Sequence, residues 1–238
     1  MFETLKNKFQ LRFKNREFAA KILAGALEDS LKMLKIDKKK DSILILSIPR
    51  GGVIVGDIVA SKLRYRCEFD IVIPRKLTAP HNQEIAIGAI MEEDETVYLN
   101  EELVNELEID KEYIEKEKAR QLEEIKRRKS LYRNLEADTT FEMNGKIVVL
   151  IDDGAATGAT IIAAARWIKG HNPGMLIIAI PVTSKDTFEA LKKECDIVVT
   201  GTMPSSSVFK TVGQYYQEFK PVEDEQVIEV CKRRKLLS

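Results

Sequence analysis

Residues 146–160 read KIVVLIDDGAATGAT, and this stretch decides the fold. It begins with an uninterrupted apolar run that ends in two acidic residues, Asp152 and Asp153. A bend of small residues follows, and the helical pattern IIAAARWI comes directly after it. An apolar run without alternation is typical of a strand covered on both faces, as in a parallel sheet. The stretch therefore predicts a buried strand, a tight turn and a helix in direct succession.

Further apolar runs of the same kind lie on both sides of this stretch. They occupy residues 43–48, 69–74, 175–182 and 196–201. Helical patterns follow several of the strands, at residues 53–63, 159–170 and 184–193. Strands that alternate with helices are most simply joined by right-handed crossovers in one sheet. We therefore expect an α/β fold with a doubly wound, mostly parallel sheet flanked by helices.

Three segments depart from this alternation. Residues 16–35 have apolar residues at helical spacing and predict an amphipathic helix. Residues 86–99 read as two short strands around an acidic turn, which predicts a projecting hairpin. Residues 101–134 are highly charged with a sparse apolar stripe, so we expect one or two solvent-facing helices. A subunit contact is the alternative for that charged stretch.

The length and composition limit the classes of protein. The 238 residues are 44% hydrophobic, and we interpret 1–238 as one domain with a core at about 36–201 and a C-terminal segment 202–238. The 38 basic and 38 acidic residues balance, which argues against nucleic acid as a partner. The three cysteines lack zinc-site spacing, and no apolar run is long enough for a membrane span. We expect a cytoplasmic protein.

The bend after the two acids has the composition of a phosphate-binding turn. Ligands gather at the carboxyl ends of parallel strands, and a helix N-terminus offers unpaired N–H groups to anions. Gly154 and Gly158 allow close backbone approach, and Thr157 and Thr160 can add hydroxyl donors. The stretch has neither the lysine of a P-loop nor the glycine spacing of a dinucleotide fold. A turn of small residues kept for packing alone is the alternative.

The acids themselves would repel a phosphate. Asp152 and Asp153 suit the hydroxyls of a ribose, which donate to carboxylates, and a divalent cation reached through water. The stretch 150–160, LIDDGAATGAT, closely resembles the signature of type I phosphoribosyltransferases, which bind 5-phosphoribosyl-1-pyrophosphate. With IPRGG at 48–52 and PRKLTAPHNQEIAIGAI at 74–90, the chain is similar over about 10–225 to a subgroup whose acceptor is unassigned.

This resemblance implies roles for the residues of the motif. Asp152 and Asp153 would hold the ribose hydroxyls, take part in catalysis and hold Mg²⁺ through those hydroxyls or water. The 5-phosphate would be bound by Gly154, Ala155, Ala156, Thr157, Gly158, Ala159 and Thr160. Arg50, Gly51 and Gly52 would form the pyrophosphate loop, where family members often keep a non-proline cis peptide. A purely structural turn is the alternative for this second loop.

The resemblance also implies a flexible loop over the substrate in the polar connection after residue 74. Arg75 and Lys76 would act there as catalytic cations that neutralise the leaving pyrophosphate, with a solvated strand end as the alternative. Glu84 could orient the loop, approach the acceptor or be an ordinary surface carboxylate. His81 and His171 lack partners for a catalytic triad, so we interpret both as solvated loop residues.

A small hood, formed by the segment 202–216 and the chain ends, would select the acceptor. An aromatic of this segment, such as Phe209, Tyr215 or Tyr216, could stack on a planar base, with core packing as the alternative. The implied activity is that of a phosphoribosyltransferase, a pentosyltransferase of nucleotide metabolism using Mg²⁺ and a small nucleobase-like acceptor. A regulatory protein that binds the ribose phosphate without catalysis is the alternative. Dimers are common in the family.

Overall fold

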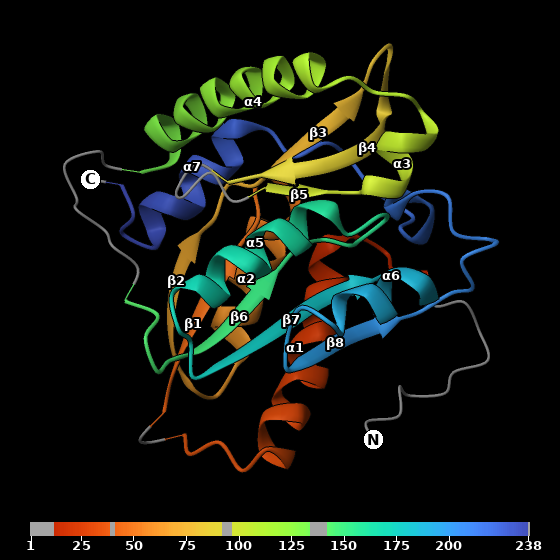
Figure 1. The fold of residues 1–238 in the computed structure, drawn as a ribbon. Helices are drawn as coiled ribbons and strands as arrows, with labels where there is room; N and C mark the ends of the chain where they lie inside the picture. Colours follow the sequence, from red (N-terminus) through yellow and green to blue (C-terminus); the bar gives the residue numbers. More distant parts are fainter. Residues whose placement is uncertain (1–11, 39–40, 92–96, 134–141, 238) are drawn as a thin grey trace.

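The centre of the protein is a parallel sheet. The structure is a computed structural model that describes residues 12–38, 41–91, 97–133 and 142–237. Its main sheet has five strands in the order β2-β1-β6-β7-β8, and every pairing is parallel (Figure 1). The strands are β1 Ser42–Ser47, β2 Arg66–Ile71, β6 Ile147–Ile151, β7 Met175–Val182 and β8 Ile197–Thr202. All five predicted strands are present, and the predicted doubly wound fold is confirmed.

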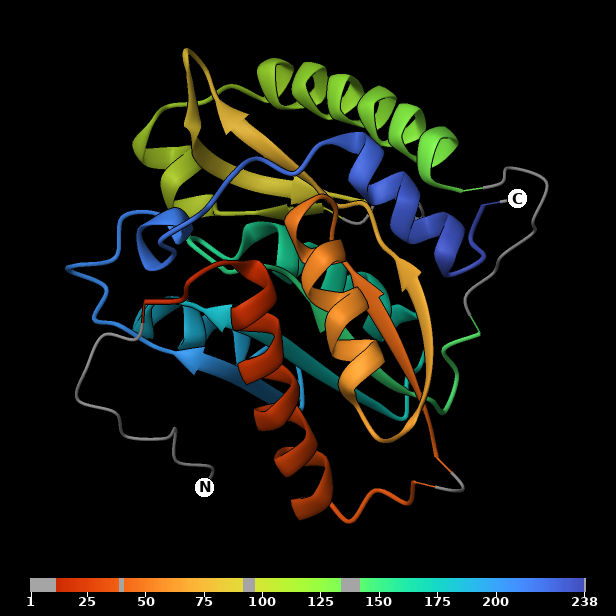
Figure 2. The ribbon, with the colours of Figure 1, turned by 180° about the vertical axis from the view of Figure 1, so that it is seen from behind.

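Helices cover both faces of the main sheet. One face carries α1 Arg16–Met33, α2 Gly51–Lys62 and α7 Asp224–Arg233, and the other carries α5 Ala159–Gly170 and α6 Lys185–Leu191 (Figures 1 and 2). Alternate residues of β6 enter the two cores. Val149 and Ile151 pack with α1 and α2, whereas Val148 and Leu150 pack with α5. This two-sided burial is the reason that the strand sequences are apolar without interruption.

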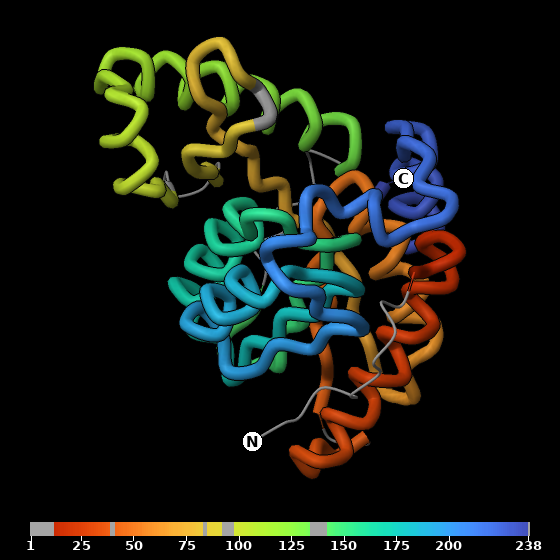
Figure 3. Tube along the Cα trace, turned by 90° about the vertical axis from the view of Figure 1, so that its right-hand side faces the viewer, coloured from red at the N-terminus to blue at the C-terminus, as the bar shows by residue number. Residues whose placement is uncertain are grey.

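A second, smaller sheet lies on top of α5. It has three antiparallel strands in the order β3-β4-β5, which are β3 Arg75–Ala79, β4 Asn82–Ile90 and β5 Val97–Leu99. Figure 3 shows this sheet and the helix above it standing out from the main body. The expected strand pair in 86–99 corresponds to β4 and β5, whereas its acidic turn at 92–96 lies outside the described residues.

The polar connection after residue 74 needs a correction. A flexible loop was expected there, but Arg75–Ala79 form a strand that turns at Pro80-His81 and pairs with β4. Leu77, Thr78 and Ala79 are buried, so this strand is a built part of the small sheet. The strand is short, and a bulge between Leu77 and Thr78 interrupts the alternation of apolar and polar residues. The sequence therefore shows no two-residue repeat that would predict a strand here.

The charged stretch after β5 forms two helices, α3 Glu101–Glu106 and α4 Lys111–Tyr132. Each begins at a side-chain cap, with Asn100 accepting from Leu103 N–H and Asp110 accepting from Tyr113 N–H. One face of α4 covers β3 and the other faces outward, as the sparse apolar stripe predicted (Figure 1). Among the described helices, none is both long enough and apolar enough to cross a membrane.

Candidate functional site

The two glycine-containing loops meet at the carboxyl edge of the main sheet. Strands β1 and β6 are neighbours, and Ile48 N–H donates to the Ile151 carbonyl at 2.9 Å just beyond their ends. A Cβ on Gly51 would lie 1.9 Å from Asp153 Oδ2, and a Cβ on Gly52 would lie 2.8 Å from the Cα of Asp152. Glycine is therefore required at both positions. The Pro49–Arg50 peptide is cis, as the resemblance implied.

The loop after the two acids is held by the strand and helix beside it. Ala155 N–H donates to the Val182 carbonyl at 2.9 Å, and Thr187 Oγ1 donates to the Ala156 carbonyl at 2.5 Å. Gly158 has a φ of +75° and serves as the N-cap of α5. That left-handed conformation reverses the chain, so the helix starts directly beneath the loop.

The loop presents unused backbone donors to solvent. Its tip is exposed at Ala156 and Thr157. Four backbone N–H groups donate to no acceptor in the described part of the chain, those of Ala156, Thr157, Gly158 and Thr160. The first backbone hydrogen bond of α5 runs from Ile162 N–H to the Gly158 carbonyl. Several N–H groups at a helix N-terminus form a site suited to a phosphate. The loop is therefore suited to an anion, and the binding of a 5-phosphate by residues 154–160 stays a prediction.

The two carboxylates lie half-buried beside this cradle. Asp153 N–H donates to Asp152 Oδ1 at 2.8 Å. Burial raises the pKa of Asp152 well above its ordinary value, and the charge of Asp153 raises it further. Burial also raises the pKa of Asp153, while the nearby Arg16 guanidinium acts in the opposite direction. Ionising both acids is therefore costly unless hydroxyl donors or cations reach them.

The acidic pair fits a magnesium ion that is shared with a ligand. Among residues 12–38, 41–91, 97–133 and 142–237, no three acidic, histidine or cysteine side chains cluster as a ready metal site. Mg²⁺ commonly takes one or two protein carboxylates and fills its other positions with water and substrate oxygens. Asp152 and Asp153 can supply that share of the ligands.

Arg16 belongs to the site, although it is absent from the residues that the sequence suggested. Its Nε donates to Asp153 Oδ2 at 2.7 Å, its Nη1 donates to the Lys220 carbonyl at 2.7 Å, and its guanidinium lies 3.9 Å from the ring centre of Phe219. The side chain is only 12% exposed. Nothing in the sequence marks Arg16 among the basic residues of its region, because 137 positions separate it from Asp153.

The C-terminal segment covers the acids from above. Tyr216 Oη donates to the Asp153 carbonyl at 2.7 Å, and a Cβ on Gly154 would lie 2.5 Å from Val212 Cγ1. Tyr215 and Tyr216 are buried at 3% and 1% exposure, so the core-packing alternative holds for these two aromatics. Phe209 is half-buried and stacks on Tyr215. The predicted hood is present, but its two tyrosines cannot stack on an acceptor.

The structure does not bring Arg75 to the carboxylates. Arg75 Nε donates to Gln121 Oε1 of α4 at 2.9 Å, and burial lowers the pKa of the guanidinium. Lys76 pairs in register with Ala89, which packs in the apolar cluster around α5. Lys76 therefore faces the helix whose N-terminus carries the loop, and Arg75 faces away from it. Of the two predicted cations, Lys76 alone is on the side of the loop.

Arg50 is held by the start of the C-terminal helix. Its Nη1 lies 3.5 Å from Glu223 Oε2 and 3.6 Å from Asp224 Oδ1. Asp224 also accepts a hydrogen bond from Tyr132 Oη at the end of α4. The loop 49–52 is thus fastened to α7 and lies close against the two acids.

The histidines lie apart from the acids. His81 is exposed at the turn between β3 and β4, with a φ of +62°. His171 ends α5, at the opposite end of that helix from the loop, and its Nδ1 lies 2.9 Å from the Trp167 carbonyl. Neither has the surroundings of a catalytic base, as expected. The side chain of Glu84 lies outside what the structure describes.

Comparisons with known proteins agree with this geometry. Residues 13–217 match the model of the phosphoribosyl transferase domain. The chain is 32% identical over 192 residues to "Putative phosphoribosyl transferase Rv0571c" of Mycobacterium tuberculosis H37Rv, covering 81% of this chain and 42% of that protein. The corresponding protein of strain CDC 1551, MT0597, matches to the same extent. The chain therefore spans about two fifths of these curated relatives.

A solved structure extends the likeness to three dimensions. The crystal structure of TT1426 from Thermus thermophilus is 36% identical, with a TM-score of 0.71. The match covers 93% of this chain and 98% of that one. With a matching domain model over most of its length and relatives above 30% identity, the chain belongs to the phosphoribosyl transferase family.

Proposed function

We propose that this chain is a phosphoribosyltransferase, a pentosyltransferase that uses 5-phosphoribosyl-1-pyrophosphate with Mg²⁺ and a small nitrogenous acceptor. One observation carries the proposal. The loop 154–160, with its unused N–H groups, the acids Asp152 and Asp153, and the loop 49–52 lie in immediate succession along one edge of the sheet. A phosphate, a ribose diol and a pyrophosphate follow one another in the same way along the proposed substrate.

In the proposed reaction an acceptor nitrogen forms a bond to ribose C1 while the bond from C1 to the pyrophosphate oxygen breaks. The electron pair of that bond leaves with pyrophosphate, and the acceptor loses its N–H proton to water. The chain acts by positioning and by stabilising charge. Asp152 and Asp153 accept from the ribose hydroxyls, and residues 154–160 hold the 5-phosphate. Asp152 and Asp153 would hold Mg²⁺ through those hydroxyls or water, and the ion would supply positive charge that eases departure of the pyrophosphate.

The proposed acceptor is nucleobase-like, which would place the protein in nucleotide metabolism. No aspartate, glutamate, histidine or lysine occurs between residues 154 and 160, so the loop itself offers no general base. The acceptor nitrogen must therefore be nucleophilic without a base from this loop, or lose its proton after the bond to C1 has formed.

Calorimetry with 5-phosphoribosyl-1-pyrophosphate and Mg²⁺ tests the binding part. We expect Asp152→Asn/Asp153→Asn to bind at least about 100-fold more weakly than the unchanged protein, because two charge-assisted hydrogen-bond acceptors are lost. Asp29→Asn, an exposed change on α1, is the matched control and should bind normally. Equal affinity in the double variant would contradict the roles given to the acids.

The transfer part is tested by pyrophosphate release, screened over purine and pyrimidine bases. Release with one or more bases is the expected result, and the double variant should abolish it. Tight binding without release by any base would instead favour the regulatory protein that binds this ligand without catalysis.

A further inference from the structure

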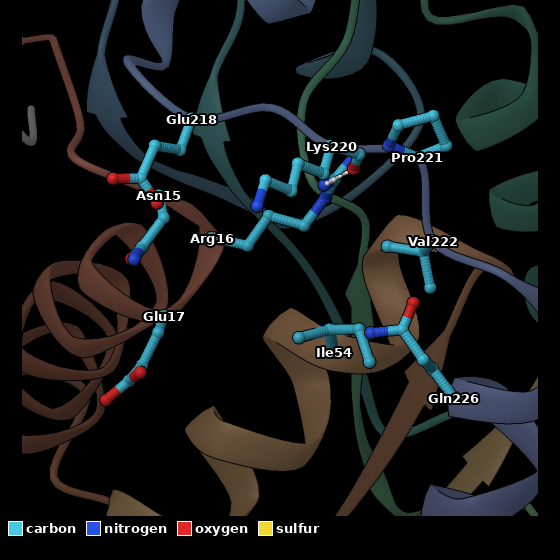
Figure 4. Close-up of a pocket in the computed structure, with 9 residues that line it drawn as sticks. All are labelled: Asn15, Arg16, Glu17, Ile54, Glu218, Lys220, Pro221, Val222 and Gln226. Atoms are coloured by element: carbon cyan, nitrogen blue, oxygen red, sulfur yellow. Dashed lines mark hydrogen bonds between the residues drawn. The ribbon is translucent and has the colours of Figure 1, made fainter.

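The surroundings of the site differ on the sides of α1 and α6. Toward α1 and α2 there is a cavity of about 170 Å³ whose lining includes four charged side chains, Arg16, Glu17, Glu218 and Lys220 (Figure 4). Its charges are mixed, so charge alone does not define a ligand for it. Toward α6, the loop 154–160 meets neutral hydroxyl groups instead, and these make a specific set of hydrogen bonds.

Two buried hydroxyl side chains at the start of α6 hold one carbonyl group of the loop. Ser184, the N-cap of α6, accepts from Thr187 N–H at 3.2 Å and donates to Thr187 Oγ1 at 3.0 Å. Thr187 Oγ1 donates in turn to the Ala156 carbonyl at 2.5 Å. A hydroxyl has one proton, so the Thr187 proton is committed to Ala156. The Thr187 methyl also packs on the loop, because a Cβ on Gly158 would lie 3.0 Å from Thr187 Cγ2.

The start of α6 is itself fixed in place. Lys185 N–H donates to the Pro204 carbonyl and Asp186 N–H donates to Ser206 Oγ, both at 3.1 Å. Thr187 is buried, so water does not compete for its hydroxyl. The hydroxyl is therefore a fixed point against which the loop is set.

This hydrogen bond decides the direction of an N–H group at the tip of the loop. Among the described residues the cis peptide is Pro49–Arg50, so the 156–157 peptide is trans. In a planar trans peptide the carbonyl and the N–H point in opposite directions. The Ala156 carbonyl points toward α6, and the Thr157 N–H of the same peptide therefore points away from it. Both residues are exposed, so packing does not hold this peptide in its orientation.

We propose that Thr187 is a positioning residue for the 5-phosphate, acting through the 156–157 peptide. The inference rests on the proposed function, in which residues 154–160 bind that phosphate. The Thr187 hydroxyl keeps the Thr157 N–H directed at the anion and the lone pairs of the Ala156 carbonyl directed away from it. Without this hydrogen bond the peptide is free to rotate, and a carbonyl oxygen turned toward the phosphate would repel it.

The test separates the two ends of the proposed substrate. Ribose 5-phosphate has the group that the loop would bind, whereas pyrophosphate with Mg²⁺ does not require this loop. By calorimetry we expect Thr187→Val, which keeps the shape and loses the hydroxyl, to bind ribose 5-phosphate about tenfold more weakly and pyrophosphate within about twofold of the unchanged protein. Thr187→Ser keeps the hydroxyl and should bind ribose 5-phosphate within about threefold.

A matched control is Thr200→Val on β8. The Thr200 hydroxyl donates to the Thr202 carbonyl at 3.2 Å, so the same chemical change removes a hydroxyl-to-carbonyl bond that does not involve the loop. This variant should bind both ligands normally.

The amide proton of Thr157 gives a direct second measurement by NMR. On saturation with ribose 5-phosphate it should move downfield in the unchanged protein and in Thr187→Ser, as a proton that donates to an anion does, and should not move in Thr187→Val. Where thermal unfolding shows that Thr187→Val does not fold, Thr187→Ala takes its place with the same expectation.

Two results would overturn the inference and leave the proposed function standing. One is normal binding of ribose 5-phosphate by the variant without the hydroxyl. The other is an equal loss of ribose 5-phosphate and pyrophosphate, which would show that Thr187 supports the fold in general. If the unchanged protein binds neither ribose 5-phosphate nor 5-phosphoribosyl-1-pyrophosphate, the proposed function fails and the inference fails with it.

Discussion

Single glycines decide how closely the two loops of the site can approach. Because Gly51 has no side chain, the Asp153 carboxylate can lie against its backbone. A Cβ at this position would lie only 1.9 Å from Asp153 Oδ2. At Gly25, within α1, a Cβ would meet nothing within 4 Å. The same substitution should therefore have opposite effects at the two positions.

Gly51→Ala should displace Asp153 and weaken binding of 5-phosphoribosyl-1-pyrophosphate by at least about tenfold, at a stability cost of about 1–3 kcal/mol for overpacking. Gly25→Ala should leave binding unchanged and raise the free energy of unfolding by about 0.5–1 kcal/mol, because alanine favours the helix. Calorimetry and urea denaturation measure both effects. Normal binding by Gly51→Ala would show that the close contact with Asp153 is not needed.

At the scale of elements, the site depends on how the two ends of the chain are fastened to the sheet. Helix α1 carries Arg16, and the segment before α7 supplies Tyr216 and Lys220. Helix α7 is anchored to α2 through the buried Asp57, which accepts from Arg233 Nη2 at 2.6 Å and from Arg234 Nε at 2.8 Å. Docking of α7 therefore supports the C-terminal part of the hood.

Asp57→Asn should loosen α7 and lower the free energy of unfolding by about 1–2 kcal/mol, because two charge-assisted bonds are weakened while both arginines can still reach water. Relative to the unchanged protein, amide hydrogen exchange should then increase more in Asp224–Arg233 than in α5. Glu229→Gln removes an exposed charge from the same helix and is the control. Unchanged protection of α7 would mean that its apolar contacts alone hold it.

For the whole molecule, 38 basic residues balance 38 acidic ones, and within the described ranges helix α4 holds several ion pairs between neighbours three or four positions apart. Arg127 and Arg128 lower the pKa of Glu124 to about 2 through hydrogen bonds on α4. A carboxyl whose folded pKa lies below its unfolded value adds stability above the unfolded pKa and loses it as the pH falls through the folded one. Asp152 and Asp153, with raised pKa values, act in the opposite direction.

Stability should therefore fall between about pH 4.5 and pH 2 partly through Glu124, whose ordinary pKa is 4.5. Glu124→Gln should have a lower Tm than the unchanged protein at pH 6, and the gap should shrink as the pH falls toward 2. Thermal unfolding monitored by circular dichroism over this range measures it. A gap that stays constant with pH would show that Glu124 contributes by packing rather than by charge.

The sequence alone determined the sheet and the loop at its edge. Strands buried on both faces must be apolar at every position, so runs such as 147–151 are visible without knowing their neighbours. The acids and the small residues that follow are contiguous in the chain, so their geometry is local. Strand β3 was missed because its bulge and its polar first residues, Arg75 and Lys76, give no period.

Tertiary structure alone decided which side chains complete the site. Arg16 reaches Asp153 across 137 positions, because α1 packs on the face of the sheet beneath the loops. The direction of Arg75 depends on which face of β3 it occupies, and the burial of Tyr215 and Tyr216 depends on how the C-terminal segment folds back. Such contacts join residues distant in the chain, and no local pattern encodes them. Apolar runs in the sequence predict the strands, because a strand covered on both faces must be apolar throughout. Which cation pairs with which acid depends on how the helices and the C-terminal segment pack.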